Sequence, residues 1–329
     1  MKVTYFHRNP VQGGYSLERL FADVRKSMPT EVEYRVVTSR YSGTRPDRLL
    51  YNMIEARNRQ RDVNHITGDI HYIALLLDPR KTLLTIPDCI GMYHLKGLKQ
   101  AAYKCLWLDL PIRCSKIVTA ISAFSASEIC RYIPQAFKKI RVVYVPVSDD
   151  FIYHSKPFNN KRPIILQFGT YTNKNLNRVV EALSGIPCLL DIIGKIGDDQ
   201  KELLSKFKID YTNSFNLTDA EIIQKYKDCD IVVFASTYEG FGMPIVEANA
   251  TGRPIVTSNI CSMPEVAGNA ACIVDPYDIG SIRAGILRVI QDADYRQNLI
   301  ENGLKNVQRF KVKNIALQYL SLYREISGG

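Results

Sequence analysis

Hydrophobic and polar positions divide the chain into two kinds of alternating segment. Short, nearly continuous apolar runs, such as Asp230–Ala235, are typical of strands buried on both faces of a parallel sheet. Segments with apolar residues at helical spacing lie between these runs. Strands that alternate with helices in this way favour an α/β fold with parallel, doubly wound sheets.

The pattern predicts elements in both halves of the chain. In the first half it predicts strands at Val3–Arg8, Val32–Val37, Val63–Thr67, Thr82–Ile86, Lys116–Ile121 and Ile140–Val147, and helices at Ser16–Met28, Arg48–Arg59, His94–Arg113 and Ser125–Tyr132. In the second half it predicts strands at Ile164–Phe168, Cys188–Ile193, Asp230–Ala235, Pro254–Thr257 and Ala271–Val274, and helices at Leu176–Leu183, Asp198–Phe207, Ala220–Lys227, Pro244–Ala250 and onward to Ile326.

Turn residues without periodicity between Pro146 and Pro163 indicate a domain boundary. We expect a first domain at residues 1–150, a hinge at 151–162, a second domain at 163–312 and a last helix within 313–329. A chain of 329 residues with 46% hydrophobic and 23% charged residues is typical of a soluble enzyme of two domains.

Targeting signals and cysteine motifs are not apparent. The first residues lack an apolar signal core and no stretch approaches the ~18 apolar residues of a membrane span, so we expect a cytoplasmic protein. The eight cysteines form no C-x-x-C pair and are expected to be reduced.

Positive charge is concentrated in the first half. Residues 1–160 contain 24 Lys and Arg against 14 Asp and Glu, whereas the remainder contains 19 of each, so the first half carries the whole excess of +10. A basic half attracts nucleic acid, anionic lipid or a phosphorylated acceptor. Since no nucleic-acid motif is present, lipid and acceptor are the favoured partners.

The run from Ser236 to Ala248 ends a buried strand, crosses a glycine turn and opens a helix. Gly240 and Gly242 permit a tight turn and a close ligand approach. Pro244 suits the first helical position, so backbone N–H groups gather where a diphosphate binds well. Glu239 and Glu247 flank this corner.

This run, with its continuation Ala250–Thr257 and Pro264–Val266, resembles the E-x7-E signature of the retaining, GT-B-fold glycosyltransferases of family four. The resemblance implies two Rossmann-like domains facing a central cleft, with the C-terminal helix crossing back to the first domain. It also implies that Glu247 binds the donor ribose and that Glu239 lies beside the sugar hydroxyls. The implied backbone ligands of the donor are Gly240, Phe241, Gly242 and Met243. The alternative is that Glu247 only favours the helix N-terminus and Glu239 is a solvated turn residue.

Two further loops resemble donor-binding loops of the family. Gly13-Gly14 stands where the family has a glycine loop that reaches the donor phosphates, although a simple turn explains it equally. Asn173-Lys174-Asn175, after Gly169-Thr170, resembles the basic loop on the diphosphate, with Lys174 as the cation. Thr170 replaces an arginine that many relatives carry, so either Lys174 and the helix terminus suffice or Arg178 substitutes.

Candidates on the acceptor side lie in the first half. Thr85-Ile86-Pro87-Asp88 resembles a Thr-x-His-Asp site with Pro87 in place of histidine, which leaves Asp88 as the candidate catalytic group. Asp69 and His71 resemble a second cleft-facing loop, although a structural role is the simpler interpretation of any single histidine. Ser125-Ala126-Ser127-Glu128 forms a helix capping box.

The predicted helix His94–Arg113 has a basic, aromatic face. Its members at helical spacing are Lys96, Lys99, Tyr103, Lys104 and Trp107. This mixture is typical of a membrane–water interface, so the helix is a candidate membrane-docking surface. The alternative is that Trp107 packs against a neighbouring loop and the lysines are merely solvated.

Two D-x-D matches raise the question of a metal. Asp228–Asp230 abuts a buried strand and Asp292–Asp294 caps a late helix, so both matches are interpreted as accidental and no metal or cofactor is expected.

The sequence therefore predicts a metal-independent, retaining hexosyltransferase that moves a sugar from a GDP- or UDP-sugar to a glycan or lipid-linked acceptor. Its expected setting is surface polysaccharide assembly, peripheral to the inner face of the membrane. Alternatives are a catalytically weak protein that binds a nucleotide sugar or anionic lipid, and a nucleotide-sugar epimerase, against which the E-x7-E run and Lys174 argue.

Overall fold

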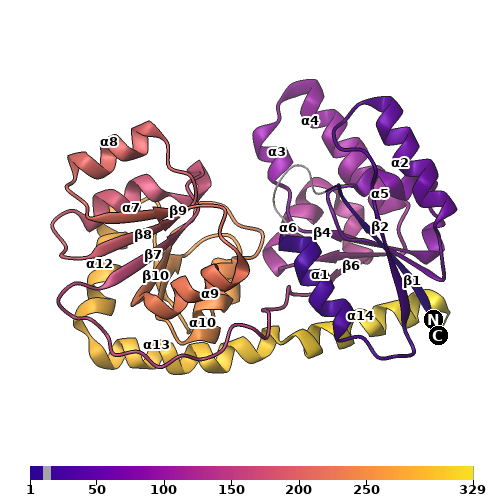
Figure 1. The fold of residues 1–329 in the computed structure, drawn as a ribbon. Helices are drawn as coiled ribbons and strands as arrows, with labels where there is room; N and C mark the ends of the chain where they lie inside the picture. Colours follow the sequence, from indigo (N-terminus) through magenta and orange to yellow (C-terminus); the bar gives the residue numbers. More distant parts are fainter. Residues whose placement is uncertain (10–15, 329) are drawn as a thin grey trace. The chain divides into compact units, whose positions relative to one another are not determined.

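The computed structural model describes residues 1–9 and 16–328, which form two compact units (Figure 1). Unit 1 comprises residues 1–148 and 311–329, and unit 2 comprises residues 149–310. Each unit is built on one six-stranded parallel sheet. Residues 151–162 group with unit 2, and the last helix groups with unit 1.

Unit 1 has the sheet order β2-β1-β3-β4-β5-β6. Its strands are β1 Lys2–His7, β2 Glu33–Thr38, β3 Val63–Ile66, β4 Thr82–Ile86, β5 Ile117–Ala120 and β6 Ile140–Val142. Its helices are α1 Ser16–Lys26, α2 Pro46–Asn58, η2 His71–Leu76, η3 Pro79–Lys81, α3 Ile90–His94, α4 Gly97–Tyr103, η4 Lys104–Asp109, α5 Leu110–Arg113, α6 Ala123–Tyr132, η5 Pro134–Lys138 and α14 Val312–Ser327.

Unit 2 has the sheet order β12-β11-β10-β7-β8-β9. Its strands are β7 Ile164–Phe168, β8 Leu189–Ile193, β9 Tyr211–Ser214, β10 Ile231–Phe234, β11 Ile255–Ser258 and β12 Cys272–Val274. Its helices are η6 Thr172–Lys174, α7 Leu176–Leu183, α8 Asp198–Lys206, α9 Asp219–Asp228, α10 Met243–Thr251, α11 Met263–Ala267, α12 Ile279–Gln291, α13 Ala293–Asn306 and η7 Val307–Phe310.

Each sheet reverses its winding direction at one place. The reversal lies between β1 and β3 in unit 1, and between β7 and β10 in unit 2. At such a point the connections leave neighbouring strands in opposite directions, which opens a crevice at the carboxyl ends of the strands, where ligands of open α/β sheets bind. The topology therefore makes the residues that follow these four strands candidates for ligand binding.

Helices cover both faces of each sheet. In unit 1, α1 and α14 pack on one face, and α2, η2, α5 and α6 pack on the other. The hydroxyl oxygen of Tyr323, in α14, lies 2.7 Å from Nδ1 of His65. Nε2 of the same ring lies 2.7 Å from Thr85 Oγ1. Because both ring nitrogens are occupied within the core, His65 is a structural residue. In unit 2, α7, α8 and α12 cover one face of the sheet.

The sequence pattern missed strand β9. Tyr211–Ser214 forms the edge of the sheet in unit 2, paired in parallel only with β8. Its residues Tyr-Thr-Asn-Ser are polar and partly exposed, so no apolar run marks the strand. Backbone pairing with β8, rather than burial of apolar side chains, defines it.

The single helix expected at His94–Arg113 is also wrong. The chain is extended at Leu95 and Lys96, and α4 begins at Gly97 with φ of +58°. A π-helical turn, η4, then leads into α5, where Pro111 lacks the N–H that a regular helix would use. Helix α6 differs in a smaller way, since Ser122 rather than Ser125 is its cap and accepts from Ser125 N.

Across residues 1–9 and 16–328, no helix combines the length and the apolar character needed to cross a membrane.

Candidate functional site

The donor residues predicted from the sequence meet at the switch point of unit 2. Lys174 ends η6, directly after β7, and Glu239 lies in the connection from β10 to α10. Lys174 Nζ is 2.6 Å from Glu239 Oε1, and both side chains are largely buried. The sequence suggested separate ligands for these residues, a phosphate for Lys174 and a sugar for Glu239. In the structure the two side chains form one ion pair.

Gly169 allows Lys174 to occupy this position. Gly169 has φ of +82°, and a Cβ there would lie 2.6 Å from Cγ of Lys174. The ammonium group of Lys174 also lies 5.2 Å from the centroid of the Phe234 ring. A charge held over a ring and beside a carboxylate is oriented before any ligand arrives.

The glycine corner between β10 and α10 is tied to its neighbours through the backbone. Ser262 Oγ lies 2.9 Å from the carbonyl oxygen of Glu239 and 2.7 Å from that of Phe241. Asn173 Nδ2 donates to the carbonyl of Tyr238, 3.1 Å away. The corner is therefore fixed by side chains that stand on the loops after β7 and β11.

Helix α10 begins at this corner. Its cap residue Gly242 has φ of +108° and supplies no side chain to the first N–H groups. Pro244 stands in the first turn, where its missing N–H costs nothing. Because a helix N-terminus carries a partial positive charge, this corner and Lys174 together can stabilise a diphosphate.

Glu247 lies one turn inside α10 and is 8% exposed. Tyr226 Oη donates to Glu247 Oε2 over 2.6 Å, and the Tyr226 ring stacks on Phe168 at 5.1 Å. Burial, followed by the charge of Glu247, raises the pKa of Tyr226 well above its usual value, so the phenol stays protonated and donates. Sequence reasoning missed Tyr226, because a tyrosine near the end of the amphipathic α9 cannot be told from an ordinary core residue.

Three other predicted donor residues have structural partners. Thr170 Oγ1 donates to the carbonyl of Lys195, which links the loops after β7 and β8. Arg178 Nη1 donates to Asn175 Oδ1 over 2.9 Å, which holds its guanidinium beside α7. Phe241 is buried, with its ring edge-on to Phe310, so only its backbone is available at the corner.

Met243 is the first residue of α10 and is half-buried. Gly13 and Gly14 lie outside the described residues.

The candidate acceptor residues Asp69, His71 and Asp88 follow β3 and β4 in unit 1. His71 Nδ1 donates to the carbonyl of Trp107 over 2.7 Å. That carbonyl is open to His71 because the residue four positions later is Pro111, which has no N–H. Within the described part of the chain, the buried Nε2 of His71 has no hydrogen-bond partner.

The carboxyl groups of Asp69 and Asp88 interact electrostatically. Desolvation by the surrounding protein raises the pKa of Asp69, although this residue is exposed at the surface, while His71, Arg8 and a hydrogen bond from the Trp107 side chain oppose the rise. Burial also raises the pKa of Asp88, which accepts from Ile90 N over 2.9 Å and is pushed further by Asp69. The three candidates therefore form one electrostatic cluster at the carboxyl end of the sheet.

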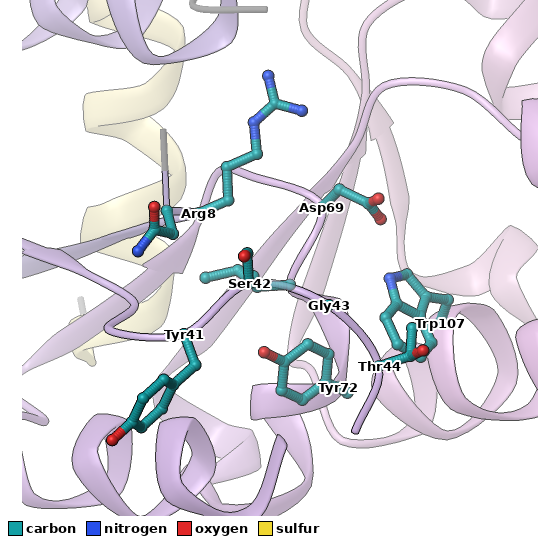
Figure 2. A pocket seen from close by; sticks show the side chains of 10 residues that line it. Arg8, Tyr41, Ser42, Gly43, Thr44, Asp69, Tyr72 and Trp107 are labelled. Carbon is teal, nitrogen blue, oxygen red and sulfur yellow. The ribbon is translucent and has the colours of Figure 1, made fainter. Parts of the chain in front are cut away.

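Trp107 is partly buried and packs beside this cluster. Its ring lies 5.2 Å from Tyr72 and 6.1 Å from Tyr103, and Figure 2 shows its indole nitrogen turned toward Asp69. Trp107 therefore packs against neighbouring rings, as the packing alternative expects, and membrane docking of this segment stays a prediction. Lys96, Lys99 and Lys104 are exposed.

In each D-x-D match, one carboxylate has a structural partner. Asp230 is buried, pairs with Lys156 Nζ at 2.6 Å and accepts from the backbone N of Ile164. Asp292 caps α13 by accepting from Tyr295 N. Among residues 1–9 and 16–328, no three His, Cys, Asp or Glu side chains gather as metal ligands would.

Comparison with known proteins places this geometry in context. The chain is 28% identical over 264 residues to the O-antigen chain mannosyltransferase B of Escherichia coli, a match that covers 74% of this chain and 68% of that protein. It is 26% identical over 223 residues to the serotype-specific mannosyltransferase WbdA of Escherichia coli, and that match spans 60% of this chain but only 27% of WbdA.

The fold has solved counterparts. HepE from Anabaena, in a crystal structure with UDP and glucose, superposes with a TM-score of 0.80 over 98% of this chain and 99% of its own, at 16% identity. The two parallel sheets with their covering helices are thus the GT-B fold. Residues 148–306 match the family model described as glycosyl transferases group 1. Fold, site and this match together make the chain similar to the group 1 glycosyltransferases.

Proposed function

We propose that the protein transfers mannose from a GDP- or UDP-linked donor to a glycan or lipid-linked acceptor, with retention at the anomeric carbon and without a metal ion. The observation that carries the proposal is the meeting of Lys174, Glu239 and Glu247 around the N-terminus of α10 at the switch point of unit 2. The choice of mannose is supported by the names of the matched mannosyltransferases. The name of the O-antigen chain mannosyltransferase B supports a role in surface polysaccharide assembly.

In this proposal the nucleotide sugar lies across the carboxyl ends of β7 and β10. Glu247, oriented by Tyr226, accepts hydrogen bonds from the ribose hydroxyls. The first-turn N–H groups of α10 and the ammonium of Lys174 face the diphosphate. Lys174 then exchanges part of its contact with Glu239 for phosphate, which frees Glu239 to accept from the sugar hydroxyls.

Catalysis requires stabilisation of the departing diphosphate while positive charge develops on the sugar. Lys174 and the helix terminus supply positive charge where the leaving group develops negative charge. With that charge supplied by the protein, the reaction needs no metal. Asp88, whose pKa is raised by burial, is proposed to orient the acceptor hydroxyl from unit 1.

The first experiment is a thermal-shift screen against UDP-, GDP-, ADP- and dTDP-sugars without added metal. A ligand at 100 times its dissociation constant adds about 2.7 kcal/mol to the stability of the folded state. One nucleotide should raise the melting temperature of the parent protein, and Glu247→Ala should abolish that rise. Glu202→Ala, on the exposed face of α8 in the same unit, is the matched control.

Transfer is then measured with the donor so identified, using mannosides as acceptors. Lys174→Ala should slow transfer far more than it weakens nucleotide binding. If neither Glu247→Ala nor Lys174→Ala changes binding or transfer, the assignment of the donor site is wrong. A protein that binds the donor tightly but transfers nothing would fit the alternative of a binding protein.

A further inference from the structure

The switch point of unit 1 is the second place where the topology opens a crevice. Arg8 follows β1 and Asp69 follows β3, so the two side chains start from neighbouring strand ends. Gly68 permits this approach, because a Cβ at residue 68 would lie 3.0 Å from the backbone N of Arg8. The residues around these ends line a pocket of about 110 Å³.

This first pocket is polar with aromatic walls (Figure 2). Asp69 stands on one side, held by a hydrogen bond from the Trp107 side chain. Tyr72 and Trp107 form a wall with their rings 5.2 Å apart, and Ser42 and Thr44 add hydroxyl groups. A carboxylate that accepts from paired hydroxyls, beside an aromatic face for the C–H side of a ring, is a combination suited to a sugar.

A second pocket, of about 530 Å³, continues from the first. The two share Thr44, Asp69 and Trp107. The rest of its lining is mainly apolar and consists of Leu49, Leu95, Lys99, Ala102, Tyr103 and Leu106. We call this second pocket the apolar groove.

The walls of the apolar groove are built into the fold. The ring of Tyr103 fills the space over Gly91, where a Cβ would come within 2.5 Å of it. The π-helical turn η4, which follows, carries both Leu106 and Trp107. Such turns inside helices are frequent at functional sites.

We propose that this bipartite site binds a lipid-linked glycan, with a sugar in the Asp69 pocket, the start of the apolar chain in the apolar groove and the linking phosphate near Lys99. The inference rests on the proposed function and makes the acceptor of that function amphipathic. A free sugar would leave the groove uncovered, whereas a lipid alone would leave Asp69 unused.

Charge supports a phosphate at the junction. Lys99 lines the groove, and Lys96 and Lys104 are exposed on the same segment. Residues 1–160 carry the entire positive excess of the chain. A positively lined entrance raises the local concentration of an anionic ligand.

The test uses Trp107 itself as the reporter. It is the only tryptophan of the chain and lines both pockets, so its fluorescence reads this site without a donor present. The probes are octyl mannoside and octyl glucoside below their micelle-forming concentrations, each compared with its methyl glycoside. At least one octyl glycoside should bind about tenfold or more tightly than its methyl counterpart, since two buried methylenes alone give a factor of that size.

Variants show which pocket causes the tighter binding of octyl glycosides. Leu106→Asp, and Ala102→Glu at an exposed groove position, should abolish the advantage of the octyl chain, while Asp69→Asn should weaken octyl and methyl glycosides alike. Leu98→Asp is the matched control, because Leu98 is 90% exposed on α4 and lines neither pocket. Melting curves of each variant check folding, and Ala102→Glu remains informative if Leu106→Asp unfolds.

Equal binding of octyl and methyl glycosides, no binding of either kind, or equal loss in Leu98→Asp would overturn the inference. Octyl phosphate serves as a further probe, and binding as tight as that of the octyl glycosides would indicate a lipid site without a sugar and reject the bipartite site. The proposed function is tested separately by transfer. Octyl glycoside binding without transfer refutes the function alone, whereas equal transfer to methyl and octyl acceptors refutes the inference alone.

Discussion

Replacing Tyr226 by phenylalanine tests whether a buried hydrogen bond prepares Glu247 for its ligand. The substitution deletes one oxygen and leaves the ring stacked on Phe168. It removes the donor that lies 2.6 Å from Glu247 Oε2, in a place where Tyr226 is fully buried and Glu247 is 8% exposed. The carboxylate then loses one of the partners that hold it in position.

The expected loss follows from the character of this bond. A hydrogen bond to a charged group contributes about 1.5–3 kcal/mol, and here little water can replace the lost donor. For a unit of this size, 1 kcal/mol shifts the melting temperature by roughly 2–4 °C, so Tyr226→Phe should lower the transition of unit 2 by about 3–12 °C. Nucleotide affinity should fall by about tenfold, because a less constrained Glu247 must be ordered by the ribose.

Calorimetric titration of the nucleotide and a melting curve measure both effects. Tyr211→Phe is the control, since Tyr211 lies on the exposed edge strand β9 of the same unit. A double-mutant cycle with Glu247→Gln then isolates the coupling between the two residues. The reasoning is refuted if Tyr226→Phe melts and binds nucleotide like the parent, or if its effects simply add to those of Glu247→Gln.

Three further outcomes are expected. Gly169→Ala should slow transfer at least ~10-fold, because the added Cβ would displace Lys174. Gly185→Ala is the control, since Gly185 has φ of +72° and no described atom lies within 4 Å of the added Cβ. Its melting curve should show only the backbone cost of about 1–2 kcal/mol. Burial lowers the pKa of His7 from 6.5 to about 4, so the free energy of unfolding of unit 1 should be highest above pH 6.5 and fall by about 3 kcal/mol as the pH drops toward 4. Urea unfolding of the parent and of His7→Gln at several pH values measures the contribution of His7. An identical fall in both proteins contradicts this prediction. Asp230→Asn should lower the free energy of unfolding of unit 2 by about 3 kcal/mol in urea, because it leaves the ammonium of Lys156 without its buried partner. A variant as stable as the parent would show that this ion pair does not stabilise unit 2.

The sequence predicted the parts of the fold that depend on local patterns. The strand before Glu239, the glycine corner and the helix that carries Glu247 all lie where the apolar run, Gly242 and Pro244 indicated. These features follow from burial and backbone geometry within a dozen residues. For the same reason, Lys174 was found from its loop but its partner was not, since 65 positions separate it from Glu239.

The misses share a cause in contacts that no local pattern encodes. Strand β9 exists because β8 offers it a backbone ladder, and Tyr226 matters because Glu247 faces it from another helix. The segment after His94 was expected to be one helix on the strength of its periodicity. Gly97 and Pro111 interrupt it, and the interruption brings Trp107 beside Asp69.

The place of α14 in unit 1 bears on the order in which the protein is made. The chain leaves unit 1 after Ser148 and returns at Lys311, and Val147 and Lys311 form a parallel bridge. All of unit 2 therefore leaves the ribosome before Tyr319 and Tyr323 can fill the core around His65. Until then the part of this sheet face that α14 covers stays open to water, so during synthesis unit 2 should be protected from proteases earlier than the amino-terminal unit that precedes it.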